Sequence, residues 1–289
     1  MMNPALKIGS LVLALCLCAV SAQAGARPVR VVSMNLCTDI LALELAAPGT
    51  VKSVFRVAAD PHDSPVADLA RAIPLNDASA EEILSYKPDL VLAHRYSSPF
   101  TLDILRRAHV PVLQIADAAT FDDIRANVRR IAAALGREKE GEAWLAAFNG
   151  TLAKAYRPGG THPPRAVIYQ DLGGAAAAHT ILGALLEHTG FENVVKAEAS
   201  GEFVNLTIEQ LIDLRPQFVA IGVYRENEPS LAHALLDHPA LHTYIARYAR
   251  TADLPARLWT CGTPFVAEVA ERLAAARDAF DAPAPPRTN

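Results

Sequence analysis

The feature that most constrains the fold of this chain is one long helical pattern, set between two regions of alternating strands and helices. Residues 138–156 have the spacing of an amphipathic helix, and the prolines and glycines at 158–164 end it firmly. Nineteen helical residues without an intervening strand are unlike the crossover of a βαβ unit. We therefore expect residues 137–158 to be a helix that connects two lobes. Its apolar stripe holds Trp144, Leu145, Phe148, Leu152 and Tyr156.

Short strand patterns alternate with helical patterns on both sides of that helix. The expected strands are residues 29–33, 51–55, 89–93, 111–115, 165–170 and 217–223. The expected helices are residues 38–46, 81–86, 101–108, 121–135, 180–189, 209–214, 231–236, 240–247 and 263–280. Such alternation predicts an α/β fold: two Rossmann-like lobes with mainly parallel sheets, helices on both faces and a ligand cleft between the lobes. We expect the lobes at residues 25–136 and 159–281, and a disordered tail at 282–289.

The first 24 residues have the pattern of a secretory signal peptide. Lys7 precedes an apolar run at residues 10–20, and Ala22-Gln23-Ala24 fits the small-residue cleavage motif. The apolar run is too short to cross a bilayer as a helix. We expect a soluble mature protein that begins near Gly25 and resides in the periplasm.

Two cysteines, Cys37 and Cys261, remain after cleavage of that leader. Thiols in an oxidising compartment often pair, which here requires the two ends of the mature chain to meet. A disulfide ranks first, followed by two inert thiols, and a soft-metal site of two thiolates is a third option.

One short pattern occurs in both halves of the chain. Residues 79–93 and 207–221 each hold a short helical pattern, a basic residue followed by Pro, and a buried strand. A glutamate stands seven residues before each proline: Glu81 in the first half and Glu209 in the second. Junctions of this kind are common in α/β proteins, so the repeat by itself does not establish duplicated lobes.

Taken together, four segments resemble the class III periplasmic substrate-binding proteins of ABC importers, the iron-siderophore and cobalamin family. They are residues 30–39 directly after the leader, Glu81 with Lys87-Pro-Asp-Leu-Val91, Glu209 with Arg215-Pro216, and Trp259-Thr-Cys-Gly-Thr-Pro264 before the last helix. The resemblance covers the mature chain. It implies two α/β lobes joined by one long helix, and an inner-membrane ABC permease as partner. It also implies that Glu81 and Glu209 dock onto arginines of that permease, which suits two carboxylates one lobe apart.

In open parallel sheets, ligands bind beyond the carboxyl ends of the strands. The loops expected there supply aromatic rings, arginines and polar groups for an anionic or macrocyclic metal chelate. The resemblance adds that Phe203 and Trp259 match positions that carry aromatic residues in cobalamin-binding members. The candidate ligand-binding residues are Cys37, Arg56, Asn76, His94, Arg95, Tyr96, Gln170, Asp171, Phe203, Tyr224, Arg225, Trp259 and Cys261.

The expected cargo is a ferric siderophore, cobalamin or haem, with no resident cofactor and a monomeric protein. His94 or Tyr96 could serve as an axial ligand to the metal of a chelate. A net charge of −4 lacks the basic footprint of a nucleic-acid binder. A His-rich loop, typical of binding proteins for naked zinc or manganese, is missing.

Two alternatives from other classes stay open: a two-lobed metal-cofactor enzyme and a periplasmic sensor domain. The chain has no Gly-x-Ser-x-Gly elbow, no dinucleotide or Walker glycine motif and no His-Glu-x-x-His sequence. The motifs of the common enzyme classes are therefore absent, and a binding protein is the favoured reading.

Overall fold

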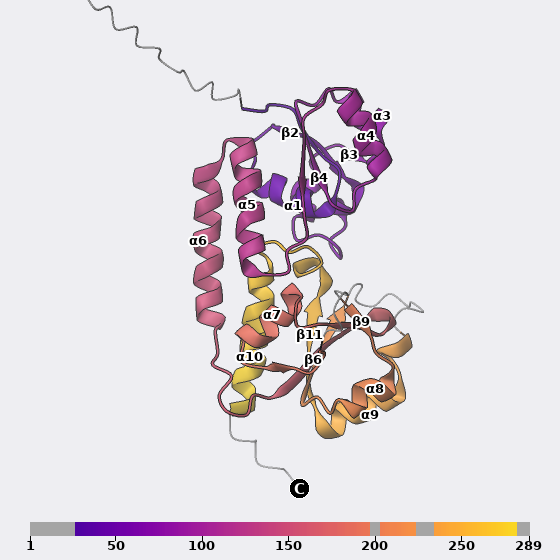
Figure 1. Ribbon diagram of the computed structural model, residues 1–289, viewed down its shortest axis with the longest axis vertical. Helices are drawn as coiled ribbons and strands as arrows, with labels where there is room; N and C mark the ends of the chain where they lie inside the picture. The colour runs from indigo at the N-terminus through magenta and orange to yellow at the C-terminus, as the bar shows by residue number, and fades with distance from the viewer. Residues whose placement is uncertain (1–26, 197–202, 224–233, 282–289) are drawn as a thin grey trace, which may run out of the picture.

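The computed structural model describes residues 27–196, 203–223 and 234–281. Two β-sheets lie one above the other along the long axis of the molecule (Figure 1), each with its own helices. The predicted signal peptide, the predicted tail, Tyr224 and Arg225 lie outside the described residues. The fold is the expected two-lobed α/β architecture.

The sheet of the first lobe has five strands, all of them parallel, in the order β3-β2-β1-β4-β5. The strands are β1 (Val31–Ser33), β2 (Val51–Phe55), β3 (Leu75–Asn76), β4 (Leu90–His94) and β5 (Val112–Ile115). Its helices are α1 (Leu36–Leu45), α2 (Ala67–Ala70), α3 (Ala80–Ser85), α4 (Pro99–Arg107) and α5 (Phe121–Leu135). The fully buried pattern of β4 is what a central parallel strand covered on both faces requires.

The sheet of the second lobe is mixed. Strands β6 (Arg165–Gln170), β10 (Phe218–Val223) and β11 (Arg250–Pro255) run parallel, and β8 (Glu192–Asn193) pairs with β6 at its start. Strands β7 (Gly174–Ala176) and β9 (Phe203–Asn205) continue the sheet in antiparallel fashion. The helices are α7 (Ile181–His188), α8 (Ile208–Asp213), α9 (Pro239–Tyr248) and α10 (Val266–Asp281).

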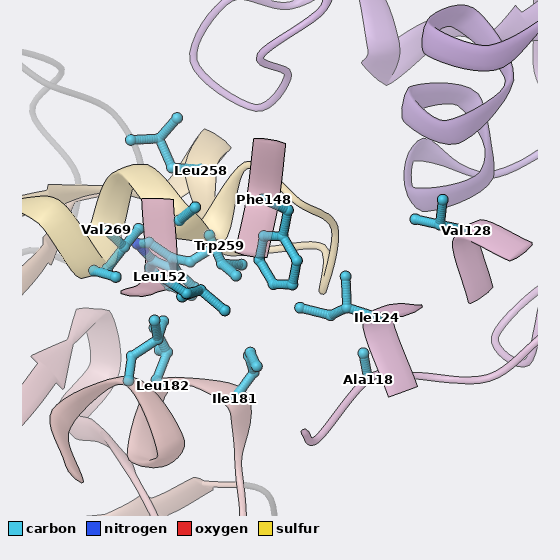
Figure 2. Packing of buried hydrophobic residues seen from close by; sticks show 14 of the residues in the cluster. Ala118, Ile124, Val128, Phe148, Leu152, Ile181, Leu182, Leu258, Trp259 and Val269 are labelled. Atoms are coloured by element: carbon cyan, nitrogen blue, oxygen red, sulfur yellow. The ribbon is translucent and has the colours of Figure 1, made fainter. Parts of the chain in front are cut away.

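Helix α6 (Glu138–Ala155) crosses from the first lobe to the second, as predicted (Figure 1). It packs against both α5 in the first lobe and α10 in the second. Phe148 and Leu152 of α6 enter a hydrophobic cluster that continues from Ile124 in the first lobe to Leu182 in the second (Figure 2). The two lobes therefore share one core and do not merely touch.

The helix–proline–strand repeat has the same backbone in both lobes. Ser79 and Thr207 cap α3 and α8 by accepting hydrogen bonds from backbone N–H groups one turn on. The basic residue before each proline has a positive φ, 49° at Lys87 and 48° at Arg215. Such a conformation is uncommon for a residue with a side chain, so its recurrence marks the two units as structurally equivalent.

Strand β11 is the main element that the sequence pattern missed. Its first four residues, Arg-Thr-Ala-Asp, are polar or small and largely exposed, and Pro255 ends it. An edge strand with one neighbour needs no apolar run, so periodicity does not reveal it. The expected helix at 231–236 falls partly outside the described residues, and residues 234–235 form a short 3-10 turn.

None of the helices in the described ranges has the length and apolar character that crossing a bilayer requires.

Two glycines of α6 provide a matched test of its packing. A Cβ on Gly141 would lie 2.7 Å from the Cβ of Ala132 on α5, whereas a Cβ on Gly150 would meet nothing within 4 Å. We expect Gly141→Ala to lower the free energy of unfolding by about 1–3 kcal/mol through overpacking. Gly150→Ala should raise it by about 0.5–1 kcal/mol, because alanine favours the helix. Urea unfolding measures both, and shifts of equal sign and size would contradict this packing.

Candidate functional site

A disulfide between Cys37 and Cys261 links the two lobes across their interface. Its Cα atoms are 5.2 Å apart, and 224 positions separate the two residues in the chain. Cys37 lies in the first turn of α1, where its backbone N–H donates to the Asn35 side chain that caps the helix. Cys261 lies in the loop between β11 and α10. The two sulfurs are bonded to each other, so neither the inert-thiol option nor the thiolate metal site describes this structure.

The second-lobe loop that carries Cys261 packs closely against the first lobe. Cys261 is 3% exposed and belongs to a cluster formed otherwise by first-lobe residues such as Leu36 and Val54. A Cβ on Gly262 would lie 2.6 Å from the Cβ of Ala118, so only a glycine permits this approach. The disulfide thus reinforces a contact that is already tight.

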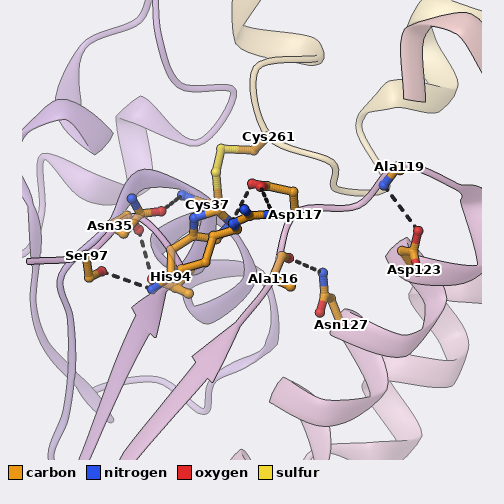
Figure 3. A network of polar contacts seen from close by, with 12 residues as sticks. Asn35, Cys37, His94, Ser97, Ala116, Asp117, Ala119, Asp123, Asn127 and Cys261 are labelled. Carbon is orange, nitrogen blue, oxygen red and sulfur yellow. Dashed lines mark hydrogen bonds and ion pairs between the residues drawn. A yellow bond between two sulfur atoms is a disulfide. The ribbon is translucent and has the colours of Figure 1, made fainter. Parts of the chain in front are cut away.

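A buried histidine lies beside the disulfide at the end of β4. The Nε2 atom of His94 is 3.1 Å from Oδ1 of Asp117, and Arg95 is 3.2 Å from the other carboxylate oxygen (Figure 3). Burial lowers the pKa of His94, which the Asp117 carboxylate partly counteracts and Arg95 reinforces. A neutral His94 that donates from Nε2 to Asp117 fits this arrangement.

A small cavity lies between the lobes next to this cluster. Its volume is about 160 Å³, and its lining includes Cys37, His94 and Asp117 from the first lobe and Ile181 and Trp259 from the second. Ordinary ligand pockets span roughly 300–1,000 Å³. This cavity is therefore too small for a macrocyclic chelate.

A second, more polar cavity of about 400 Å³ also opens between the lobes. The loop after β2 provides Pro61, His62 and Ser64, and the second lobe provides Val223 and Arg257, at and just beyond the carboxyl ends of β10 and β11. This is where an open parallel sheet is expected to bind a ligand. Its volume falls in the range of ligand pockets, so we take it as the described part of the candidate cleft.

Asn76 does not present its amide to the cleft, which corrects its inclusion among the ligand-binding residues. Its side chain is buried, and Nδ2 donates to the backbone oxygen of Ser33 and to Oγ of Ser53. Its Oδ1 accepts from the backbone N–H of Ala78. These bonds tie the ends of three neighbouring strands together, which is a structural use of the amide.

Trp259 and Gln170 are also largely withdrawn from the cleft, in contrast to the expectation. The Trp259 side chain donates from Nε1 to the oxygen of Leu254 and is part of the shared core. Its ring and the stem of Gln170 both lie against Gly222, where a Cβ would come within 3.0 Å of each. Trp259 therefore lines the small cavity but has no exposed ring face on which a macrocycle could stack.

Both candidate ligand-binding arginines of the first lobe form ion pairs with aspartates. Arg56 is 3.1 Å from Asp77, in an exposed ion pair, and Arg95 pairs with Asp117.

Tyr96 is the exposed aromatic residue among the described candidates. Its exposed fraction is 64%, and the guanidinium of Arg95 lies 5.1 Å from the centre of its ring. Asp171 is half-buried at the start of the turn after β6. Phe203 lies in β9, and only its backbone is described.

Three residues of the site were not among the candidates: Asp117, His62 and Arg257. Asp117 follows β5, so the rule that ligands bind beyond strand ends would have included it, and His62 lies in a loop that was considered. Arg257 follows β11, and missing that strand meant missing the residue. Within the described ranges, no group of three or more His, Cys, Asp or Glu side chains is arranged to hold a metal ion.

Comparison with known proteins gives consistent results. The family model described as periplasmic binding protein matches residues 31–247. A vitamin B12-binding protein of Pectobacterium atrosepticum is 30% identical over 152 residues, which are 49% of this chain and 53% of that protein. The match thus spans about half the length of that relative.

Solved structures match over more of their length. The heme-binding protein BhuT, solved in complex with two hemes, has a TM-score of 0.70 at 23% identity, covering 88% of this chain and 99% of that one. The vitamin B12-binding protein BtuF of Vibrio cholerae has a TM-score of 0.66 at 16% identity, covering 89% and 99%. At these identities the structural matches establish the fold.

The disulfide leads to a direct stability test. A bond that closes a loop of this length restricts the unfolded chain, and its loss typically costs about 2–5 kcal/mol. We expect Cys37→Ala with Cys261→Ala to lower the free energy of unfolding by that amount. Reductant should lower it similarly in the wild type and leave the double variant unchanged. A wild type that is fully reduced by mass yet unfolds at the same urea concentration would contradict this role.

Proposed function

The chain belongs to the periplasmic binding protein family, and from that premise we propose that it is the substrate-binding subunit of an ABC importer. It captures a metal chelate between its lobes and delivers the chelate to a permease in the inner membrane. The family is one of binding proteins, so the enzyme and sensor alternatives have no separate support. It also implies a periplasmic or extracellular location, in keeping with the predicted leader and its cleavage near Ala24.

The observation that carries the importer role is the equivalence of Glu81 and Glu209. Each is exposed and is the second residue of a short capped helix, α3 or α8. These helices lie in different lobes, on the side of the molecule away from α6 (Figure 1). Hydrogen bonds from its own backbone N–H and from Thr207 lower the pKa of Glu209, which favours its charged form. Two matched carboxylates, one on each lobe, suit a bivalent, oriented contact with a cationic partner.

The proposed cargo is a chelate of the haem, cobalamin or ferric-siderophore type. The names of the relatives include both heme-binding and vitamin B12-binding proteins, which supports this class. The exposed rings of Tyr96 and Phe100 extend from the end of β4 and the start of α4, and Leu172 is exposed at the end of β6. Apolar groups at strand ends of both lobes could contact the faces of a macrocycle.

Of the two candidate axial ligands, Tyr96 fits the role better than His94. The His94 side chain is buried, and its Nε2 faces Asp117 within the protein. Tyr96 is exposed, so its hydroxyl is accessible to a ligand outside the protein. Phenolate is an established protein ligand of haem iron. A chelate that lacks an open metal site would use Tyr96 only as a packing surface.

The cargo class is tested with purified mature protein and three chelates: hemin, cyanocobalamin and a ferric siderophore. We expect one of them to bind and to raise the melting temperature, because a ligand that binds only the folded state stabilises it. If hemin binds, Tyr96→Phe should remove the phenolate-to-iron charge-transfer absorption and weaken binding about tenfold or more. His109→Asn, an exposed change at a position with φ of 56°, is the control. Failure of all three chelates to bind would refute the proposed cargo.

The docking role is tested in proteoliposomes that hold the importer's permease. We expect Glu81→Lys with Glu209→Lys to reduce ligand-driven ATP hydrolysis at least tenfold, since both contacts change from attraction to repulsion. Ligand affinity in free solution should stay unchanged, and each single variant should have an intermediate effect. Glu271→Lys, an exposed change on α10, controls for net charge. Wild-type rates in the double variant would contradict the docking role.

A further inference from the structure

We propose that Arg257 binds an anionic group of the cargo, so that the transported chelate is one with a peripheral carboxylate. This inference deepens the proposed function and rests on it. It starts from the larger interlobe cavity, in which Arg257 is the one arginine among the described lining residues. The residue was not expected from the sequence, because it follows the strand that the pattern missed.

The backbone that carries Arg257 is firmly held. Arg257 is the middle residue of a 3-10 turn, Ala256–Leu258, that follows β11 directly. Its neighbours Ala256 and Leu258 are buried in the core shared by the two lobes. The backbone N–H groups of Trp259 and Thr260 donate to the oxygen of Ala256 and close the turn. Arg257 therefore lines the cavity from a fixed backbone position, so the turn that carries it does not have to be ordered when a ligand binds.

The charge of Arg257 is uncompensated in the part of the chain that the structure describes. The other arginines near the interface have acid partners: Arg56 pairs with Asp77, and Arg95 pairs with Asp117. Arg257 is half-buried, and no described residue forms an ion pair or a side-chain hydrogen bond with it. A partly buried cation without a partner has lost water on one side, which favours an anion from outside.

The remaining cavity lining does not neutralise this charge. Among the lining residues that the structure describes, Asp68 is the acid, and it is bound by Arg71 at 2.6 Å with its own side chain 94% exposed. Three prolines, Pro61, Pro65 and Pro255, line the cavity and have no backbone N–H to offer a ligand. Donors from the backbone are thus reduced on the described part of this surface, where the guanidinium is the permanently charged donor.

The chemistry of the guanidinium indicates the class of anion. Its planar array of N–H donors matches the two oxygens of a carboxylate, and such paired charge-assisted hydrogen bonds are among the strongest in proteins. Haem and carboxylate siderophores have such groups at their edges. Cyanocobalamin has amides and one phosphodiester but no carboxylate, and ferrichrome has hydroxamates. Arg257 therefore selects carboxylate-bearing chelates over those without one.

The test compares pairs of chelates that differ in this group. Hemin is compared with its dimethyl ester, and ferric citrate with ferrichrome, using wild type, Arg257→Gln and Arg257→Lys. Arg107→Gln, which removes an exposed arginine of α4 paired with Asp103, is the matched control. Circular dichroism and melting temperature verify that the variants fold. Dissociation constants come from fluorescence quenching or calorimetry at low and at high salt.

We expect the wild type to bind the carboxylate member of a pair at least tenfold more tightly than the other member. Arg257→Gln should weaken binding of that member about tenfold and leave the other within twofold, whereas Arg257→Lys should retain part of the preference. Equal affinity for acid and ester, equal effects of Arg257→Gln and Arg107→Gln, or binding of cyanocobalamin or ferrichrome alone would overturn the inference. The last result would leave the proposed function intact. A wild type that binds no chelate would instead refute the proposed function, and this inference with it.

Discussion

The contact between the two lobes is the constraint on which the rest of this structure depends. Three links hold it: helix α6, the Cys37–Cys261 disulfide and a hydrophobic cluster that continues from one lobe into the other. Burial of apolar surface supplies the favourable free energy, and the disulfide restricts the unfolded chain. Because the carboxyl ends of the parallel strands meet at this contact, it also sets the width of the cleft.

Helices and strands with a regular spacing of apolar residues could be predicted from the sequence. The apolar stripe of residues 138–156 predicted α6 to within one residue, and the runs at β2 and β6 were predicted at their observed bounds. The expected compartment and the cysteine count ranked a Cys37–Cys261 disulfide first without excluding free thiols, and the structure contains the bond. The two helix–proline–strand units were recognisable, and their common backbone, with positive φ at Lys87 and Arg215, is a finding of the structure.

The side chains of the cleft were harder to predict, because loop position does not determine side-chain direction. Asn76 ends β3 and Trp259 lies beyond β11, so both are near strand ends, yet the side chains of both point inward and hydrogen-bond to backbone groups. Backbone N–H and C=O groups at strand ends lack partners in the sheet, and a buried polar side chain that hydrogen-bonds to them is not available to a ligand. Strand β11 could not be predicted for a different reason. Among the described strands it pairs on one side only and needs no apolar alternation, so the sequence pattern did not reveal it, and Arg257 just beyond it was not a candidate.

A stiff contact between lobes has a consequence for how selectivity arises. A ligand changes a conformational equilibrium only to the extent that it binds one state better than another. Where a helix, a disulfide and a shared core all oppose rotation of the lobes, closure contributes little to discrimination. Selectivity then depends on groups that are already in position, such as the exposed ring of Tyr96 and the uncompensated charge of Arg257 among the described residues. Groups held on a fixed backbone bind with a smaller ordering cost, so the rigidity of the interface and the recognition of the cargo are parts of one arrangement.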